Sequence, residues 1–191
     1  MIDAALAHIA QQLNQSLRRA YLVTEDLVVV SSLHECDGAL ATGTANRLAL
    51  FLVNLQRDTV GGVSPRAAPQ ARQVMQPAPV HLNLMLMIAA NFGGSTYQEG
   101  LKLLSSALAF FQSRPLFDHH NTPDLDRRID RLVMDLENLD YAQLSQVWGL
   151  FGGRYLPSVA YRLRLITIDA GHSQGTRPAV QEPQVGLGSA T

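Results

Sequence analysis

The segment "VHLNLMLMIAAN" at residues 80–91 constrains the fold more than any other part of the chain. Its side chains alternate in character with the two-residue period of a β-strand. One face carries Val80, Leu82, Leu84, Leu86 and Ile88, and the other carries His81, Asn83, Met85 and Met87. We expect the aliphatic face to line the core. Methionine adapts to irregular surfaces, so we expect the second face to be covered by one of the protein's own helices or by another subunit.

Four further segments have the composition of strands. Residues 26–32 and 46–58 are short, aliphatic or β-branched runs, and residues 131–138 and 159–165 alternate between apolar and charged residues. Asp135 and Glu137 share one face of the third segment, and Arg162 and Arg164 share one face of the fourth. If these two strands are neighbours, cross-strand ion pairs follow; otherwise the arginines form a basic patch for a partner.

Three segments have the apolar spacing of amphipathic helices. The first has its stripe at Ile2, Leu6, Ile9, Leu13 and Leu17. In the second, Ser95 and Thr96 precede Gln98 and Glu99 as capping boxes, and the expected stripe is Tyr97, Leu101, Leu104, Leu108 and Phe111. In the third, Asp140 and Gln143 form a capping box, the core side is Leu144, Val147, Trp148 and Phe151, and Gly152-Gly153 ends the helix.

This order of elements predicts an α+β domain: a single mixed, largely antiparallel β-sheet with three main helices packed on it. At 191 residues the chain has room for one domain of ordinary size, which we place at residues 1–169. Residues 170–191 have little to bury and are expected to form an extended or flexible tail. Residues 58–79 lack a stable period and are expected to form a loop, either a partner-binding arm, with Arg66 and Arg72 as interface residues, or a flexible connection.

Composition argues against several functional classes. The net charge of −1 provides no general attraction for nucleic acid or a membrane surface. The one cysteine, Cys36, favours a reducing compartment, and no segment has the features of a signal peptide or the length to insert into a bilayer. We therefore expect a protein made in the cytoplasm, without nucleic acid as a partner and without direct membrane insertion.

No local motif in the sequence indicates a catalytic, nucleotide-binding or metal-binding site. Gly93-Gly94 leads from a strand into a helix, where anions can bind, but the lysine of a phosphate loop and the glycine spacing of a dinucleotide fingerprint are both missing. The clusters at residues 34–37 and 118–120 lack the paired spacing of metal ligands. Gly152-Gly153 follows a helix and so cannot form a phosphate turn at a helix start. We expect no catalytic residue, no metal and no cofactor, and hence no enzyme.

Several segments together resemble a known family: "MIDAAL", "PVHLNLMLMIAANF", "YQEGLKLLSSALAFFQSRPLF" and "RLVMDLENLDYAQLSQVWGLFGGRYLPSVAYRLRLITID". They are similar to the N-terminal domain of the tail-terminator or cap protein of contractile injection systems of the antifeeding-prophage and virulence-cassette type. The similarity covers about residues 1–169 and is densest after Pro79. No matching motif is found at residues 33–45, at residues 58–79 or after Ala170.

The resemblance implies a structural protein of a phage-tail-like particle. It implies a homohexameric ring on the distal end of the inner tube and the sheath, which ends polymerisation and anchors the last sheath layer. The implied partners are the sheath protein, the inner tube protein and a possible second cap paralogue, in a particle that is released or membrane-anchored. Half-polar strand faces suit the heterologous contacts of a ring, and Arg162, Arg164, Asp135 and Glu137 are the interface candidates. An open sheet edge could also take up a strand of the sheath. The alternatives are a nucleotide-binding enzyme using Gly93-Gly94 and a protein-binding adaptor that forms no ring.

Overall fold

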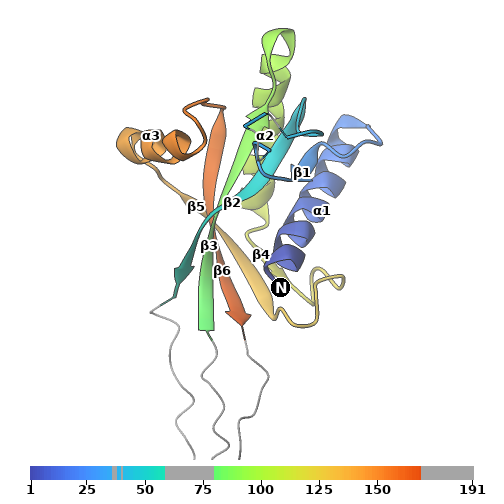
Figure 1. The fold of residues 1–191 in the computed structure, drawn as a ribbon. Coiled ribbons are helices and arrows are strands. Elements are labelled where there is room, and N and C mark those ends of the chain that lie inside the picture. The colour runs from blue at the N-terminus through green and yellow to red at the C-terminus, as the bar shows by residue number, and fades with distance from the viewer. Residues whose placement is uncertain (36–37, 40, 59–79, 169–191) are drawn as a thin grey trace, which may run out of the picture.

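The computed structural model describes residues 1–35, 38–39, 41–58 and 80–168, with side chains to residue 164. Within these residues three helices pack on one sheet of six strands (Figure 1). The helices are α1 (Ile2–Tyr21), α2 (Tyr97–Ser113) and α3 (Tyr141–Leu150), and a short 3-10 turn, η1 (Gly94–Thr96), precedes α2. The strands are β1 (Val28–Val30), β2 (Arg47–Arg57), β3 (Val80–Asn91), β4 (Leu116–Asp118), β5 (Arg131–Glu137) and β6 (Ser158–Ile168).

The sheet has the strand order β1-β2-β3-β6-β5-β4. The pair β1-β2 is parallel and the other four pairs are antiparallel. The α+β class and the mixed, largely antiparallel sheet are thus confirmed. Residues 80–91, from which the prediction started, form β3, and the long strands β2 and β6 flank it on either side.

The sheet is covered on both faces, and each face has its own core. Helices α1 and α2 lie against one face and α3 lies against the other (Figure 1). Leu84, Leu86 and Ile88 of β3 are fully buried on the α1 and α2 side. Met87 and Ala89 belong to a smaller cluster with Trp148 of α3. The methionine-bearing face of β3 is therefore covered, at this end, by the protein's own third helix.

Helix α1 packs its apolar stripe into the larger core as expected, with Leu6, Ile9, Leu13 and Leu17 buried. It ends at Leu22, whose backbone is in the left-handed region at φ 55° and ψ 39°. The backbone N–H groups of Leu22 and Val23 both donate to the Arg18 carbonyl, which closes the helix end. Glycine usually fills this position, because a side chain is strained there.

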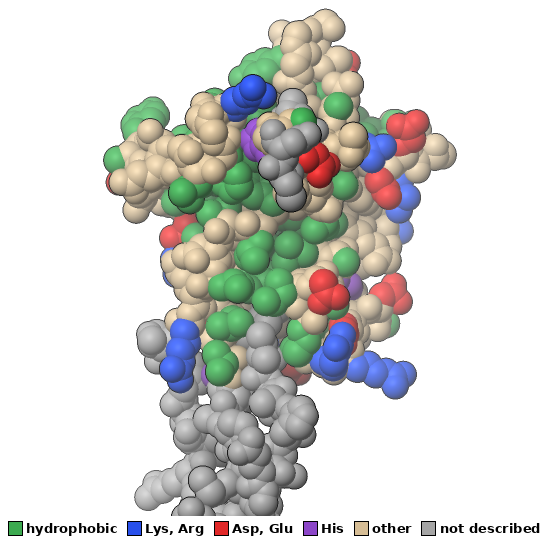
Figure 2. All heavy atoms as spheres, in the orientation of Figure 1, with side chains coloured by type: hydrophobic (Ala, Val, Ile, Leu, Met, Phe, Trp, Pro, Cys, Tyr) green, Lys and Arg blue, Asp and Glu red, His purple; other side chains and the backbone are tan. Residues whose placement is uncertain are grey.

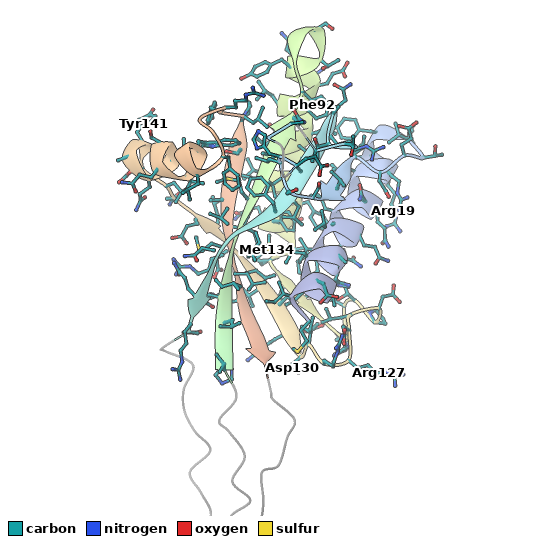
Figure 3. All side chains as sticks on the ribbon, viewed as in Figure 1. Arg19, Phe92, Arg127, Asp130, Met134 and Tyr141 are labelled. Carbon is teal, nitrogen blue, oxygen red and sulfur yellow. The ribbon has the colours of Figure 1, made fainter. Side chains whose placement is uncertain are left out.

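The buried face of α2 differs from the expected one. It consists of Gly100, Leu103, Leu104, Ala107 and Phe111, whereas Tyr97 and Leu101 are 46% and 38% exposed. A Cβ at position 100 would lie 2.8 Å from the Phe92 side chain, so the helix approaches the end of β3 at its glycine (Figure 3). This close approach sets the rotation of α2, and hydrophobic periodicity alone could not reveal it.

Two further local features differ from the expectation. No side chain caps α2: the Thr96 backbone, at φ −94° and ψ 1°, lacks the extended conformation of an N-cap, and its hydroxyl lies within hydrogen-bond distance of Asn46 Oδ1 (3.1 Å) and the Gly93 carbonyl (2.9 Å). Residues 116–118 form the edge strand β4, where no strand was expected. A three-residue strand is too short to have a detectable period.

His8 is a polar residue in the larger core and predicts a pH-dependent stability. Its side chain is 4% exposed, its ring meets Phe117 edge-on, and its Nε2 atom has no hydrogen-bond partner within the described ranges. Burial lowers the pKa of His8 below its usual 6.5; the Asp124 carboxylate opposes this shift and His119 adds to it. The folded chain therefore binds a proton at His8 less readily than the unfolded chain does. The stability associated with neutral His8 is present above its unfolded pKa and is lost as the pH falls toward its folded pKa.

We expect the free energy of unfolding to fall as the pH is lowered from about 7 through about 6 toward the folded pKa of His8. Urea unfolding of the wild-type chain and of a His8→Leu variant at a series of pH values measures this. The variant should show a smaller loss over that range, because it lacks the buried imidazole. Parallel pH curves for the two chains would show that His8 makes no contribution.

Candidate partner-binding surface

Four of the six interface residues expected from the sequence are brought together where β5 and β6 pair. Asp135 lies opposite Arg162 in the register, and the ion pairs run diagonally across the two strands. Arg162 Nη2 lies 2.7 Å from Glu137 Oε1, and Arg164 Nε lies 2.5 Å from Asp135 Oδ2. All four side chains are between 26% and 47% exposed. The two strands are thus neighbours, and each arginine is paired with a carboxylate. The four side chains form a neutralised row of charges, which we call the ladder, instead of a basic patch. Arg66 and Arg72 lie outside the described residues.

A groove opens beside this ladder on the α3 face of the sheet. It has a volume of about 530 Å³ and is lined by apolar side chains, among them Val53, Met85, Leu139, Val147 and Leu150, together with Glu137 and Arg162 of the ladder. We call it the α3 groove. Helix α3 packs over Met87 and Ala89 of β3 and leaves the part of this sheet face around Val53 and Met85 open.

Helix α3 is fixed at both ends by its sequence. The Gln143 N–H donates to Asp140 Oδ1 (2.7 Å), and the Asp140 N–H donates to Gln143 Oε1 (3.0 Å), as the capping box predicts. At the other end Gly152 and Gly153 have φ values of 76° and 72°, and their N–H groups donate to the Gly149 and Trp148 carbonyls. The glycines are thus a helix stop, as expected.

The groove also offers polar atoms to a partner. Arg162 uses Nη2 for Glu137, and both residues belong to the lining. The side chains of Gln143 and Gln146 line the groove as well. A surface with an apolar floor and uncharged amides suits a protein segment better than a small charged substrate.

Asparagine side chains occupy backbone groups of the two short edge strands, β1 and β4. On β1, Asn14 Oδ1 accepts from the N–H groups of Leu27 (2.9 Å) and Val28 (2.8 Å), and Asn14 Nδ2 donates to the Val28 carbonyl (2.8 Å).

On β4, the Asp118 N–H donates to Asn121 Oδ1 (3.0 Å), and Asn121 Nδ2 donates to the Leu116 carbonyl (2.9 Å). Each amide occupies backbone groups that an added strand would need. These contacts weigh against strand addition at β1 and β4, but among the described residues β1 pairs only with residues 48–50 of β2 and leaves the rest of that strand uncovered on this side.

The other candidate sites contribute structure. Asp118 Oδ1 accepts from the N–H groups of His120 and Asn121, so this carboxylate closes its own turn. No group of three or more metal-ligating side chains converges anywhere in the part of the chain that the structure describes. In the same part, no helix combines the length and hydropathy that crossing a membrane requires.

Hydrophobic side chains gather over the strands between α3 and α1 on the face seen in Figure 2, and charged side chains lie mainly around them. Sequence reasoning missed this distribution, the α3 groove and the role of Asn14. The sequence signal for Asn14 was the position of its amide beside the apolar stripe of α1, where a helix pattern alone indicates only a polar interruption.

The ladder provides a direct test of its own energetics. Replacing Arg162 and Arg164 by glutamate puts four carboxylates on adjacent strands, and we expect the free energy of unfolding to fall by about 1–2 kcal/mol. Adding Asp135→Arg and Glu137→Arg should restore it, because the fourfold variant inverts each ion pair. Urea unfolding at low and high salt measures both, and the loss should shrink with salt. A double variant as stable as the wild type would show that the pairs contribute nothing.

Comparison with known proteins was made at the level of sequence and of structure. The sequence matches the family model described as the Pvc16 N-terminal domain over residues 4–182. No curated protein matches the sequence.

Among solved structures, one is a sheath/tube terminator of the PVC extracellular contractile injection system in the extended state. It matches with a TM-score of 0.52 and 13% identity, covering 96% of this chain and 63% of that one. A second is the tube-terminating cap of the anti-feeding prophage, with a TM-score of 0.46 and 14% identity, covering 97% of this chain and 61% of that one.

This chain thus spans less than two thirds of the length of either structure. At 13% identity the first structure establishes a shared fold. The family model covers nearly all of the described chain, including the helix-capping, groove and ladder residues. The resemblance drawn from the sequence motifs is confirmed: the chain belongs to the Pvc16 N-terminal domain family.

Proposed function

We propose that this chain is a structural terminator of a phage-tail-like contractile injection system. In this role it binds the distal end of the inner tube and the sheath, ends their polymerisation and anchors the last sheath layer. The observation that carries the proposal is the family match over residues 4–182, together with a fold shared along 96% of the chain with a protein described as a sheath/tube terminator.

We further propose a homohexameric ring as the working form. A ring is built from heterologous contacts, in which two different surfaces of each subunit meet. The chain offers such different surfaces, because the α3 groove and the ladder lie on the sheet beyond α3, while α1 and α2 cover the opposite face. Residues 1–169 would form the ring domain and residues 170–191 a tail, although the family model extends to residue 182.

The contacts with sheath and tube are proposed to use side-chain surfaces. Asn14 and Asn121 occupy backbone groups of the short edge strands β1 and β4, and the α3 groove is open and has an adaptable floor that includes Met85. A second cap paralogue at the same end would be a further partner. The proposed role needs no catalysis, metal or cofactor, and assembly would take place in the cytoplasm before the particle is released or anchored.

The ring is tested by native mass spectrometry and negative-stain electron microscopy of the purified chain, alone and mixed with purified inner tube. The expected species has six times the chain mass of 20.8 kDa and sixfold averages, at least when the tube is present. A chain that stays a monomer with tube and sheath present, and that binds neither, would contradict the proposal.

A further inference from the structure

The end of α1 carries a run of exposed apolar residues, which we call the apolar tip: Ala20, Tyr21, Leu22 and Val23. Tyr21 and Val23 are each 38% exposed and Leu22 is 91% exposed. Single exposed apolar side chains are ordinary, but consecutive ones are unfavourable unless they have a function. The tip is therefore a candidate contact surface.

Leu22 adds a second observation. It occupies the left-handed position that ends α1, where glycine or asparagine would fit without strain. Its backbone hydrogen bond to Arg18 would be made equally well by either residue, and its side chain is almost entirely in solvent. The leucine side chain thus contributes strain and exposed apolar area to the isolated fold, which points to a use outside it.

The same chain has a matching socket. The α3 groove has a volume of about 530 Å³, an apolar floor that includes Val53 and Met85, and Leu150 on its rim at 79% exposure. The tip belongs to α1 and the groove to the α3 face, and these lie on opposite sides of the sheet (Figure 1). The tip of one chain therefore cannot reach its own groove.

We propose that the apolar tip of one copy, centred on Leu22, docks into the α3 groove of a second copy. The contact is heterologous, because tip and groove are different surfaces, so each copy has one of each and successive copies join head to tail. For its biological setting this inference rests on the proposed ring, in which such a contact closes after six copies.

A smaller hollow of about 430 Å³ lies beside the tip itself, lined by Tyr21, Val23, Glu99 and Lys102 among others. Mutual insertion of two tips into these hollows would give a twofold dimer. Each receptor has two charged residues in its lining, Glu99 and Lys102 in this hollow and Glu137 and Arg162 in the α3 groove, so charge does not distinguish them. The two arrangements differ in stoichiometry and in the residues that they need, so one experiment separates them.

The test uses sedimentation equilibrium of the full chain with three variants. Leu22→Asn removes the apolar side chain but suits the left-handed backbone, and Leu150→Lys places a charge on the exposed rim of the groove. Tyr141→Ser is the matched control, since Tyr141 is a 93% exposed apolar residue that does not line the groove (Figure 3). We expect each of the first two to weaken self-association about tenfold or more, and the control to change it less than about twofold.

Mixing the two variants gives the most specific result. Leu22→Asn chains keep an intact groove, and Leu150→Lys chains keep an intact tip, so one intact contact can form between them. An equimolar mixture should therefore form species of two chains and no larger ones. Leu22→Cys and Leu150→Cys chains, each with Cys36→Ser, should also be joined by a short bis-maleimide when mixed. This captures a contact too brief for sedimentation.

Leu22→Asn should unfold at the same or a higher denaturant concentration than the wild type, so a lost contact cannot be attributed to a damaged fold. Self-association unchanged by Leu22→Asn, a mixture no better than either variant alone, or no cross-link would overturn the inference. A dimer sensitive to Leu22→Asn but not to Leu150→Lys would replace it with the twofold contact. Electron microscopy of the particles separates this inference from the proposed function. If the two variants associate when mixed but the wild-type chain never caps a tube, this inference stands and the proposed function is wrong.

Discussion

Replacing Asn14 by alanine is expected to lower the free energy of unfolding by about 3–5 kcal/mol. The side chain is 5% exposed and makes three hydrogen bonds, two from backbone N–H groups of residues 27 and 28 and one to the Val28 carbonyl. Alanine leaves all three backbone groups without a partner at a buried position, so the penalty includes their desolvation. Urea unfolding followed by circular dichroism measures the change.

Asn121→Ala is the matched control, because Asn121 makes the same kind of amide contact on β4 but is exposed. Water can replace its hydrogen bonds, and the expected loss is about 1 kcal/mol. A similar loss for the two variants, or an Asn14→Ala variant within about 1 kcal/mol of the wild type, would contradict the role given to Asn14. The opened β1 edge should also make Asn14→Ala more prone to aggregate.

Trp148→Ala is the second large effect, with an expected loss of about 3–5 kcal/mol. Trp148 is the one described residue of α3 that is fully buried, at 3% exposure, and its ring packs edge-on against Phe151 and Tyr155. Its removal leaves the short α3 with few contacts to the sheet. The α3 groove should therefore lose one wall, and partner binding should fall with it.

Amide hydrogen exchange localises this effect. In Trp148→Ala, protection should be lost in α3 first and kept in α1 and α2, which belong to the other core cluster. Tyr141→Ala on the same helix, with its side chain 93% exposed, should change stability by less than about 0.5 kcal/mol. Uniform loss of protection over the whole chain would mean that the two clusters do not behave separately.

The elements with long periods were predictable from the sequence. The alternation of residues 80–91 predicted β3 with its observed bounds, and the Asp140–Gln143 box and the Gly152-Gly153 stop predicted both ends of α3. These signals are local, since each depends on neighbours within a few residues. The rotation of α2 was not predictable, because it depends on the contact of Gly100 with Phe92 of another element.

The candidate surface was predictable only in part. The shared faces of Asp135 with Glu137 and of Arg162 with Arg164 were visible in the sequence, but ion pairing depended on β5 and β6 being neighbours. The α3 groove depends on which part of the sheet α3 covers, and the Asn14 contacts depend on the packing of α1 beside β1. Such features depend on tertiary register, which a single sequence does not encode locally.

A terminator sets the length of the tube and sheath that it ends. Electron microscopy of particles from cells that lack the gene, with the lengths of tube and sheath measured before and after the wild-type gene is restored, tests whether this chain does so. We expect tubes and sheaths of widely varying length without the chain and one uniform length with it. Particles of the same uniform length in its absence would show that the chain is not the terminator.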